Sequence, residues 1–216
     1  VTYNTRDGMG QGGIHIKTTR FLTISNNTFR NFRITDIVAN GIEMEFEDDL
    51  EDGLVTICNN VFEEIGGTAI ALNGAQSVVV SGNIIRNCGF DTVYPAPNGP
   101  LNYAAGRSAG DPVNVTKRCG ISVFTADTYQ VRHAIIKDNV IVDTAGFMMY
   151  GIVFASTGTP LEQFDNVVIR DNVIVGAVTA KYYLPTSAAV GANVIVDELV
   201  DASNKQILTE LPISEG

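Results

Sequence analysis

The chain has 216 residues, of which 45% are hydrophobic, and it carries a formal net charge of −10. A nucleic-acid-binding protein normally shows a cluster of Lys and Arg, and this sequence has none, so we expect no nucleic-acid partner. No apolar segment approaches the roughly 18 residues of a membrane span, so we expect no membrane insertion. The first residue is Val1 and no signal peptide follows, so we expect the sequence to be part of a longer protein.

Two short phrases alternate along the chain, and each is a candidate strand. The first phrase reads LTISNNTF, VTICNNVF, VVVSGNII, AIIKDNVI, VVIRDNVI and a more divergent AAVGANVI, aligned on Asn27, Asn60, Asn83, Asn139, Asn172 and Asn193. The second phrase reads GIHI, GIEM, AIAL, GISV and GIVF, starting at Gly13, Gly41, Ala69, Gly120 and Gly151. Each phrase is too short for a helix, and its alternation of apolar with variable residues is typical of a half-buried strand.

These strands recur in one direction with no amphipathic helical pattern between them, which excludes a βαβ sheet. The remaining arrangement is a coil, in which each repeat forms one rung and equivalent strands stack into parallel sheets about 4.8 Å apart. We expect the asparagines of the first five copies to form an inward ladder at a turn, each amide bonding the amides above and below. We expect the Gly that opens the second phrase to permit the bend into the next strand.

The two interleaved phrases resemble the right-handed parallel β-helix family, the fold of pectate lyases and of many bacteriophage tailspikes. The resemblance covers about residues 10–197. It implies an all-β, right-handed parallel β-helix (a solenoid) of about six rungs over residues 1–197, with one long inserted loop at 89–118 and a C-terminal cap or linker at 198–216. Such spikes are usually homotrimers. The sequence lacks the Gly-His-Gly and Arg-x-Lys motifs of the polygalacturonase-like branch, so the resemblance implies no particular reaction.

In the segment GIEMEFED, apolar residues alternate with Glu43, Glu45 and Glu47, so the glutamates should share the outer surface. Stacking the second phrases in register places His15 beside Glu43 and Lys17 beside Glu45. Two carboxylates about 6.5–9.5 Å apart suit inverting glycoside hydrolysis. We therefore take Glu43 and Glu45 as the candidate acid and base, with His15 assisting. The alternative is a solvated acidic face in which His15 and Lys17 only reduce repulsion.

The inserted loop carries aromatic and charged residues among several prolines. Aromatic rings stack on the apolar faces of sugars, and Arg and Asp bond hydroxyl groups. The candidate substrate-binding residues are therefore Tyr94, Tyr103, Arg107 and Asp111, together with Lys17. The alternative is a surface loop that contacts a neighbouring subunit. At its neck, Cys88 and Cys119 either form a disulfide or, as we expect, remain buried free thiols.

Two further groups of charged residues have structural interpretations. Lys137 and Arg170 should stack in one column and Asp138 and Asp171 in the next, as a ladder of charges at a turn, while His133 should lie at the surface. We expect no cofactor and no metal centre. Calcium binding is nevertheless open for an acidic run that offers several oxygen ligands, namely Glu47, Asp48, Asp49, Glu51 and Asp52.

The leading hypothesis is an extracellular or virion (tail) β-helix, similar to a segment of a tailspike or depolymerase. It would recognise a polysaccharide and, if the carboxylate pair is catalytic, cleave it. One alternative is a non-catalytic structural or adhesive β-helix. Another is a secreted bacterial polysaccharide lyase that uses a Lys or Arg base and calcium. Digestion of glycans separates these three, because a hydrolase, a lyase and an adhesin leave different products.

Overall fold

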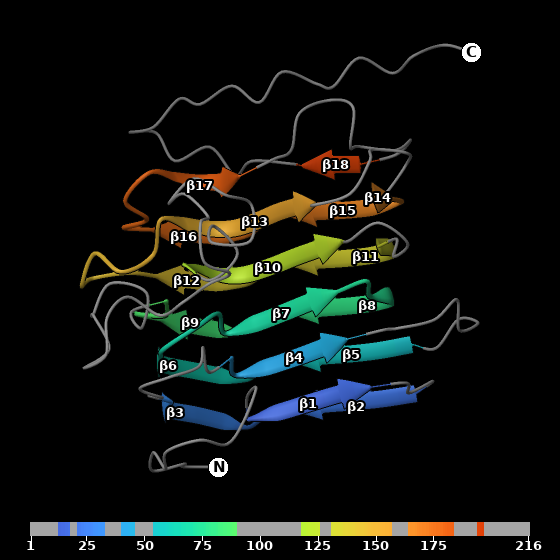
Figure 1. Ribbon diagram of the computed structural model, residues 1–216, viewed down its shortest axis with the longest axis horizontal. Helices are drawn as coiled ribbons and strands as arrows, with labels where there is room; N and C mark the ends of the chain where they lie inside the picture. Colours follow the sequence, from blue (N-terminus) through green and yellow to red (C-terminus); the bar gives the residue numbers. More distant parts are fainter. Residues whose placement is uncertain are drawn as a thin grey trace, which may run out of the picture.

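The computed structural model describes residues 13–17, 21–32, 40–45, 54–89, 118–125, 131–156, 164–183 and 194–196. There the chain passes through three short strands in turn and then begins the next rung above the last one (Figure 1). Equivalent strands of successive rungs pair in parallel, so three sheets run along the stack. The prediction of an all-β parallel solenoid of about six rungs is confirmed.

Within the described residues, the three sheets have five to seven strands each. The first sheet contains β1 (Ile14–Lys17), β4 (Ile42–Glu45), β7 (Ile70–Asn73), β10 (Cys119–Thr125), β13 (Tyr150–Ser156) and β17 (Ala180–Tyr183). The second contains β2 (Phe21–Ser25), β5 (Leu54–Cys58), β8 (Gln76–Ser81), β11 (Val131–Lys137), β15 (Val167–Arg170) and β18 (Val194–Val196), with β14 (Phe164–Asp165) also paired to β11. The third contains β3 (Thr28–Phe32), β6 (Val61–Ile65), β9 (Ile84–Arg86), β12 (Val140–Val142) and β16 (Val173–Val175).

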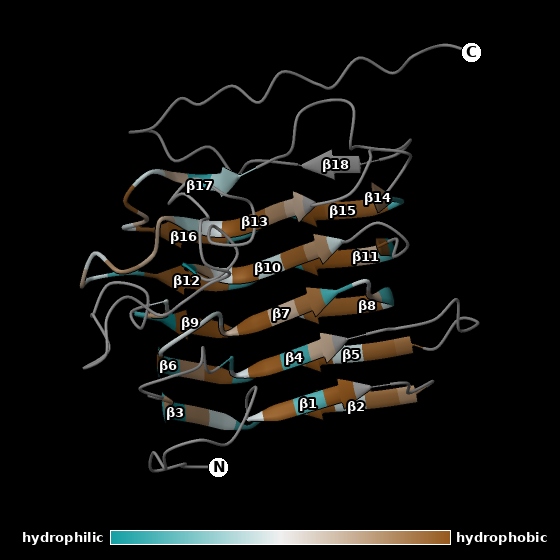
Figure 2. Cartoon of the chain, viewed as in Figure 1, coloured by the Kyte–Doolittle hydropathy of each residue, from teal (hydrophilic) through white to brown (hydrophobic). Residues whose placement is uncertain are grey.

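Inward-facing apolar side chains from all three sheets fill the interior of the stack. Figure 2 shows hydrophobic residues in strands at every level of the coil. Phe29 and Phe62, on adjacent rungs of the third sheet, stack face to face with their ring centroids 4.7 Å apart. Each such side chain contributes roughly 1.5–3 kcal/mol when fully buried. The largest fully buried side chains are Phe29, Phe62, Phe154, Phe164, Ile42, Met44, Ile57, Ile65, Ile70, Leu72, Ile85 and Ile121.

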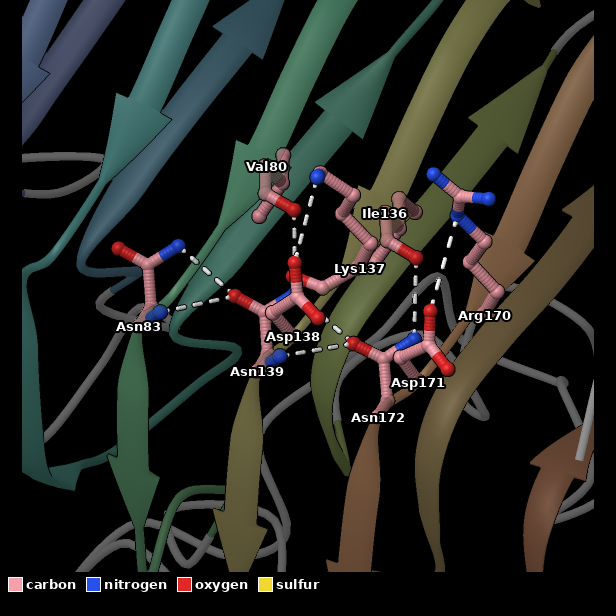
Figure 3. Close-up of polar contacts among 9 residues, drawn as sticks. All are labelled: Val80, Asn83, Ile136, Lys137, Asp138, Asn139, Arg170, Asp171 and Asn172. Atoms are coloured by element: carbon pink, nitrogen blue, oxygen red, sulfur yellow. Dashed lines mark hydrogen bonds and ion pairs between the residues drawn. The ribbon is translucent and has the colours of Figure 1, made fainter. Parts of the chain in front are cut away.

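The predicted asparagine ladder lies at the corner between the second and third sheets. Each Nδ2 donates to the Oδ1 of the asparagine one rung further along, at 3.2, 3.1, 2.9 and 2.9 Å through the series Asn27, Asn60, Asn83, Asn139 and Asn172. The backbone N–H of each donor residue bonds the same oxygen. From Asn60 onward, Nδ2 also donates to a carbonyl of the preceding rung. Figure 3 shows this bond for Asn139 and Asn172. The ladder thus satisfies backbone groups that the corner leaves without strand partners.

The residue before each ladder asparagine adopts the left-handed conformation that a sharp corner requires. These residues, with φ between 55° and 64°, are Asn26, Asn59, Gly82, Asp138 and Asp171. Asn, Asp and Gly tolerate this region better than other residues, which explains why the copies vary only among these three types. Lys137 pairs with Arg170 on the adjacent rung, which confirms the predicted column of basic residues. Each contacts the aspartate that follows it, Asp138 at 3.3 Å and Asp171 at 3.7 Å (Figure 3).

The glycines that open the second phrase are required for space, which corrects the prediction that they supply conformational freedom. Gly13, Gly41, Gly120 and Gly151 do not have φ values in the left-handed region. A Cβ at Gly151 would lie 2.5 Å from Ile174 Cγ2 and 3.0 Å from the Lys181 carbonyl oxygen. The third-sheet side chain and the next rung therefore approach these backbones too closely for any side chain.

The sixth copy of the first phrase does not keep the predicted alignment. Alignment on Asn193 would pair Val194 with Val173 in the third sheet, but Val194 pairs with Val167 in the second sheet. The backbone pairing of β18 therefore contradicts that alignment. Three consecutive β-branched residues fit either sheet, so a short phrase cannot specify the register of this strand. Asn193 itself is outside the described residues.

Replacing Asn139 by Ala should strongly destabilise the fold. The substitution leaves the buried N–H and amide of Asn83 without their acceptor and removes the donor to the Val80 carbonyl. We expect a loss of about 2–4 kcal/mol in the free energy of unfolding, measured by urea denaturation. The control is Lys137→Ala, which removes one partly exposed ion pair and should cost less than about 0.5 kcal/mol. Equal losses in the two variants would contradict a supporting role for the ladder.

Gly151→Ala should destabilise the protein by about 1–3 kcal/mol, because the new methyl group overlaps Ile174. A double-mutant cycle isolates this overlap. In an Ile174→Ala background, the cost of Gly151→Ala should fall by at least about 0.5 kcal/mol. An unchanged cost would show that the glycine is needed for another reason. Unfolding monitored by circular dichroism provides the measurement.

Candidate functional site

The outer face of the first sheet brings together the candidate residues of the first two rungs. The register pairs His15 with Glu43 and Lys17 with Glu45, as predicted from the sequence. For Lys17 and Glu45, only the pairing of their backbones is described. One continuous column along the stack, called the outer column below, comprises His15, Glu43, Ala71, Ser122, Val153 and Tyr183.

Glu43 lies on the outer face of the sheet but is not exposed to solvent. Its exposed fraction is 8%, and Ala71 and Ser122, further along the outer column, are 3% and 2% exposed. The expectation of a solvated acidic surface is therefore wrong at Glu43. Strand alternation decides which face a residue occupies, but the exposure of that face depends on the rest of the tertiary structure.

A single polar contact is described for the Glu43 carboxylate. Asn73 lies one rung further along and two residues away along the strand, and its Nδ2 donates to Glu43 Oε1 at 3.2 Å. His15 is half-buried and lies on the rung before Glu43, whereas Asn73 lies on the rung after it. The backbones of His15 and Glu43 are about 4.8 Å apart. A shielded carboxylate interacts with hydroxyl donors and cations more strongly than an exposed one, because little water screens it. The carboxylate can therefore accept hydrogen bonds from donors that reach it.

The same face becomes apolar and aromatic towards the later rungs. Val153 and Ala155 are buried together with Cys119, and Phe124, Tyr150 and Tyr183 pack against them. The rings of Tyr150 and Tyr183 meet edge to face with their centroids 5.2 Å apart. This aromatic group was not predicted from the sequence. Its signal was present, since Tyr183 falls in the outer column once the second phrase is extended to AKYY.

The inserted loop leaves the stack at the corner where the first sheet begins. At one end, the backbone N–H of Gly89 donates to the carbonyls of Ile65 and Gly67, at 2.9 and 2.8 Å. At the other end, Arg118 donates through Nε and Nη2 to the Phe147 carbonyl, at 3.2 and 3.1 Å. Burial lowers the pKa of Arg118, and the nearby Asp143 carboxylate opposes this shift. Both ends of the loop are thus tied to adjacent rungs.

Asp143 is a second buried carboxylate near this corner, and its bonds indicate a structural role. Its Oδ1 accepts the backbone N–H groups of Ala145 and Gly146, and its Oδ2 accepts that of Met148 at 2.7 Å. Three backbone donors hold the carboxylate and shape the turn between the third and first sheets.

The two cysteines at the neck of the loop are buried free thiols, as expected. Cys119 Sγ lies 3.6 Å from the Thr68 hydroxyl, and the Cys88 thiol donates to the Arg86 carbonyl. Burial raises the pKa of the Cys88 thiol from 9.0 to about 12. A thiol with this pKa is not a nucleophile near neutral pH, since the thiolate is the reactive form.

Several candidate residues lie outside the described residues. These are the loop residues Tyr94, Tyr103, Arg107 and Asp111 and the acidic run Glu47, Asp48, Asp49, Glu51 and Asp52. In the part of the chain that the structure describes, no three His, Cys, Asp or Glu side chains are grouped so as to hold a metal ion. Within the same residues, no helix has the length and apolar character to cross a bilayer.

Comparison with protein families finds a match that spans most of the chain. A family model described as "Right handed beta helix region" matches residues 12–195. Comparisons with curated proteins and with solved structures find no match.

The buried Cys88 thiol predicts a pH dependence of stability. Between about pH 9 and pH 12 the unfolded chain loses this proton while the folded chain keeps it. The unfolded state then binds fewer protons, so the free energy of unfolding should fall as pH rises, by up to about 1.4 kcal/mol per pH unit. Below about pH 8 the unfolded chain also keeps the proton, so the group should contribute almost no slope.

Urea denaturation at pH 8, 9 and 10.5 of the wild type and of Cys88→Ala tests this dependence. The stability advantage of the wild type over the variant should shrink as the pH rises. For the control Ile85→Val, a nearby core change without a titrating group, the difference should stay constant. A constant difference for Cys88→Ala would show that the thiol ionises similarly in both states.

Proposed function

The chain belongs to the right-handed β-helix family, and from this premise we propose that it binds an extracellular polysaccharide along the outer face of its first sheet. One observation carries the proposal: this face combines a shielded carboxylate, Glu43, with an aromatic group that includes Tyr150 and Tyr183. Hydroxyl groups of a sugar bond carboxylates and amides, while its apolar ring faces pack on aromatic side chains.

The repetitive architecture suits a repetitive ligand. Outer side chains of the first sheet recur about 4.8 Å apart along the stack, and the half-buried residues of the described rungs, His15 at the early end and Tyr150 and Tyr183 at the later end, can contact one extended chain. We propose that the aromatic and charged residues of the inserted loop, among them Tyr103 and Arg107, contribute to binding the sugar. The setting for this activity is outside a cell, on a secreted protein or on a virion tail.

We further propose that this face hydrolyses the bound glycan. Glu43 and Glu45 are two residues apart on β4, so their backbones lie about 6.6 Å apart on one face. This spacing is compatible with the carboxyl separation of about 6.5–9.5 Å in inverting glycosidases, where one group protonates the leaving oxygen and the other activates water. Asn73 would hold the Glu43 carboxylate in place, and His15 would assist in proton transfer.

A panel of capsular and O-antigen polysaccharides provides the test, with binding measured by calorimetry and cleavage by release of reducing ends. Glu43→Gln should keep ligand affinity within a few-fold and reduce cleavage at least about 100-fold, because the amide cannot transfer the proton. Tyr183→Ala should weaken binding about 10-fold. Glu63→Gln, on the third sheet, is the matched control and should change neither property.

The outcomes separate the candidate functions. Failure of every polysaccharide to bind would refute the proposal. Binding without released oligosaccharide would leave an adhesive β-helix and remove the hydrolase assignment. Products with ultraviolet absorption from an unsaturated sugar would identify a lyase. Full cleavage by Glu43→Gln would remove Glu43 as acid or base.

A further inference from the structure

Three side chains on the outer face of the first sheet are buried although they point away from the core. Glu43, Ala71 and Ser122 lie in the outer column on three successive rungs and are 8%, 3% and 2% exposed. Val173 also points outwards, from the third sheet, and is 46% exposed. The regular stack alone therefore does not bury an outward side chain, and these three need a cover.

The described residues around this part of the outer column do not supply the cover. Ala71 lies between Glu43 and Ser122, and the next outward residue along its strand is Asn73. The aromatic group described above packs against the next rung along, at Val153. Every strand of the described residues belongs to one of the three walls of the stack, so none of them lies over this face. The cover is therefore another part of the chain.

A turn beside this part of the face is buried as well. Gly66 and Gly67 connect the third sheet to the first in the rung before the inserted loop, and both are buried. The corresponding turn in the rung after the loop, at residues 144–146, is exposed. Connections between strands normally lie at the surface. The buried turn therefore indicates that the cover extends over the rungs before the loop.

The inserted loop, residues 89–118, begins beside this turn. The backbone N–H of Gly89 donates to the Gly67 carbonyl at 2.8 Å, so the loop starts against the preceding rung. Its last residue, Arg118, directly precedes the strand that carries Ser122. An extended chain advances about 3.3 Å per residue, so the loop is long enough to cross the roughly 10 Å from Ser122 to Glu43 and return.

From these observations we infer that residues 90–117 fold back over the preceding rungs and pack on the outer face of the first sheet from Ser122 to Glu43. Other segments outside the described ranges start further from this face. Residues 46–53, 126–130 and 157–163 follow the carboxyl ends of first-sheet strands, at the opposite side from the loop. Residues 1–12 precede β1, three rungs before Ser122, and residues 197–216 follow β18 of the second sheet.

This packing divides the outer face of the first sheet into two parts. The part that carries Glu43 lies under the inserted loop, whereas Tyr150 and Tyr183 remain half-buried on the later rungs. The loop therefore shields the Glu43 carboxylate and determines which ligands reach it. This consequence for ligands rests on the proposed function. The packing itself does not, and the tests below use no glycan.

Thiol labelling of the full 216-residue chain tests whether the face is covered. Ser122→Cys is combined with Cys58→Ser, and the matched control is Val173→Cys in the same background. The buried Cys88 and Cys119 remain in place, and mass spectrometry of peptides identifies the labelled residue. The thiol of Ser122→Cys should react with a maleimide at least about 100-fold more slowly than that of Val173→Cys, because a covered thiol reacts only when the cover opens.

Removal of the inserted loop tests whether this segment is the cover. Residues 89–118 are replaced by Gly-Gly, the connection that the preceding rung uses at the same corner between Ile65 and Thr68. In this variant, the thiol of Ser122→Cys should react within about 10-fold of the rate for Val173→Cys. Removal of residues 197–216 is the control and should leave Ser122→Cys protected. Circular dichroism verifies that each variant is folded.

Disulfide trapping in the full chain is a second measurement, which does not require the shortened variant to fold. Single cysteines are placed in turn along residues 90–117 and 1–12, each together with Ser122→Cys, and are oxidised with glutathione disulfide. A disulfide needs Cα atoms within about 7 Å of each other, so at least one position in 90–117 should pair with Ser122→Cys. The same scan with Val173→Cys should give no disulfide.

Each result bears on the inference. Equal labelling of Ser122→Cys and Val173→Cys in the full chain would overturn it. Protection of Ser122→Cys that persists in a folded variant without the loop would overturn it as well, and so would disulfides formed only with residues 1–12. Protection that is lost with the loop, together with a disulfide to a position in 90–117, would establish it. If the shortened variant does not fold, the disulfide scan decides.

Discussion

The stack depends on the hydrogen bonds of the asparagine ladder, whose members from Asn60 to Asn172 are buried. At the corner between the second and third sheets, the backbone N–H of each ladder asparagine from Asn27 to Asn139 bonds the Oδ1 of the next asparagine and not a backbone carbonyl. Each ladder asparagine from Asn60 to Asn139 supplies an acceptor for the rung before and donors for the rungs on both sides. Because an unpaired buried amide is costly, neighbouring rungs can stack well in only one register.

In that register, residues at equivalent positions of successive rungs form columns. The residue types in each column determine the chemistry of the outer face. A residue at one position of the phrase has neighbours of equivalent position about 4.8 Å above and below. On the first sheet this places His15 beside Glu43 and continues to Tyr183. On the third sheet it builds a row of exposed valines next to a charged row. Two faces of one regular scaffold can therefore serve different purposes.

Sequence reasoning reached the register of the candidate site because stacking follows from repetition. Aligning GIHI on GIEM was enough to predict that His15 pairs with Glu43 and Lys17 with Glu45. The same reasoning failed for β18, because its phrase lacks the Asn, Asp or Gly that precedes the ladder asparagine in the other copies. Sequence reasoning also assigned a conformational role to Gly151. A glycine is required there because Ile174, on a different strand, leaves no space for a side chain.

By itself, the sequence determined the fold class, the ladder and the columns, because all three arise from local phrases whose hydrogen bonds and apolar faces repeat. Only the tertiary structure decided that Glu43 is shielded, that Tyr150 and Tyr183 share its face, and that the third sheet leaves its valines exposed. Exposure depends on what lies over a face and on the sizes of side chains from strands far apart in the chain. Neither is encoded in the period of a repeat.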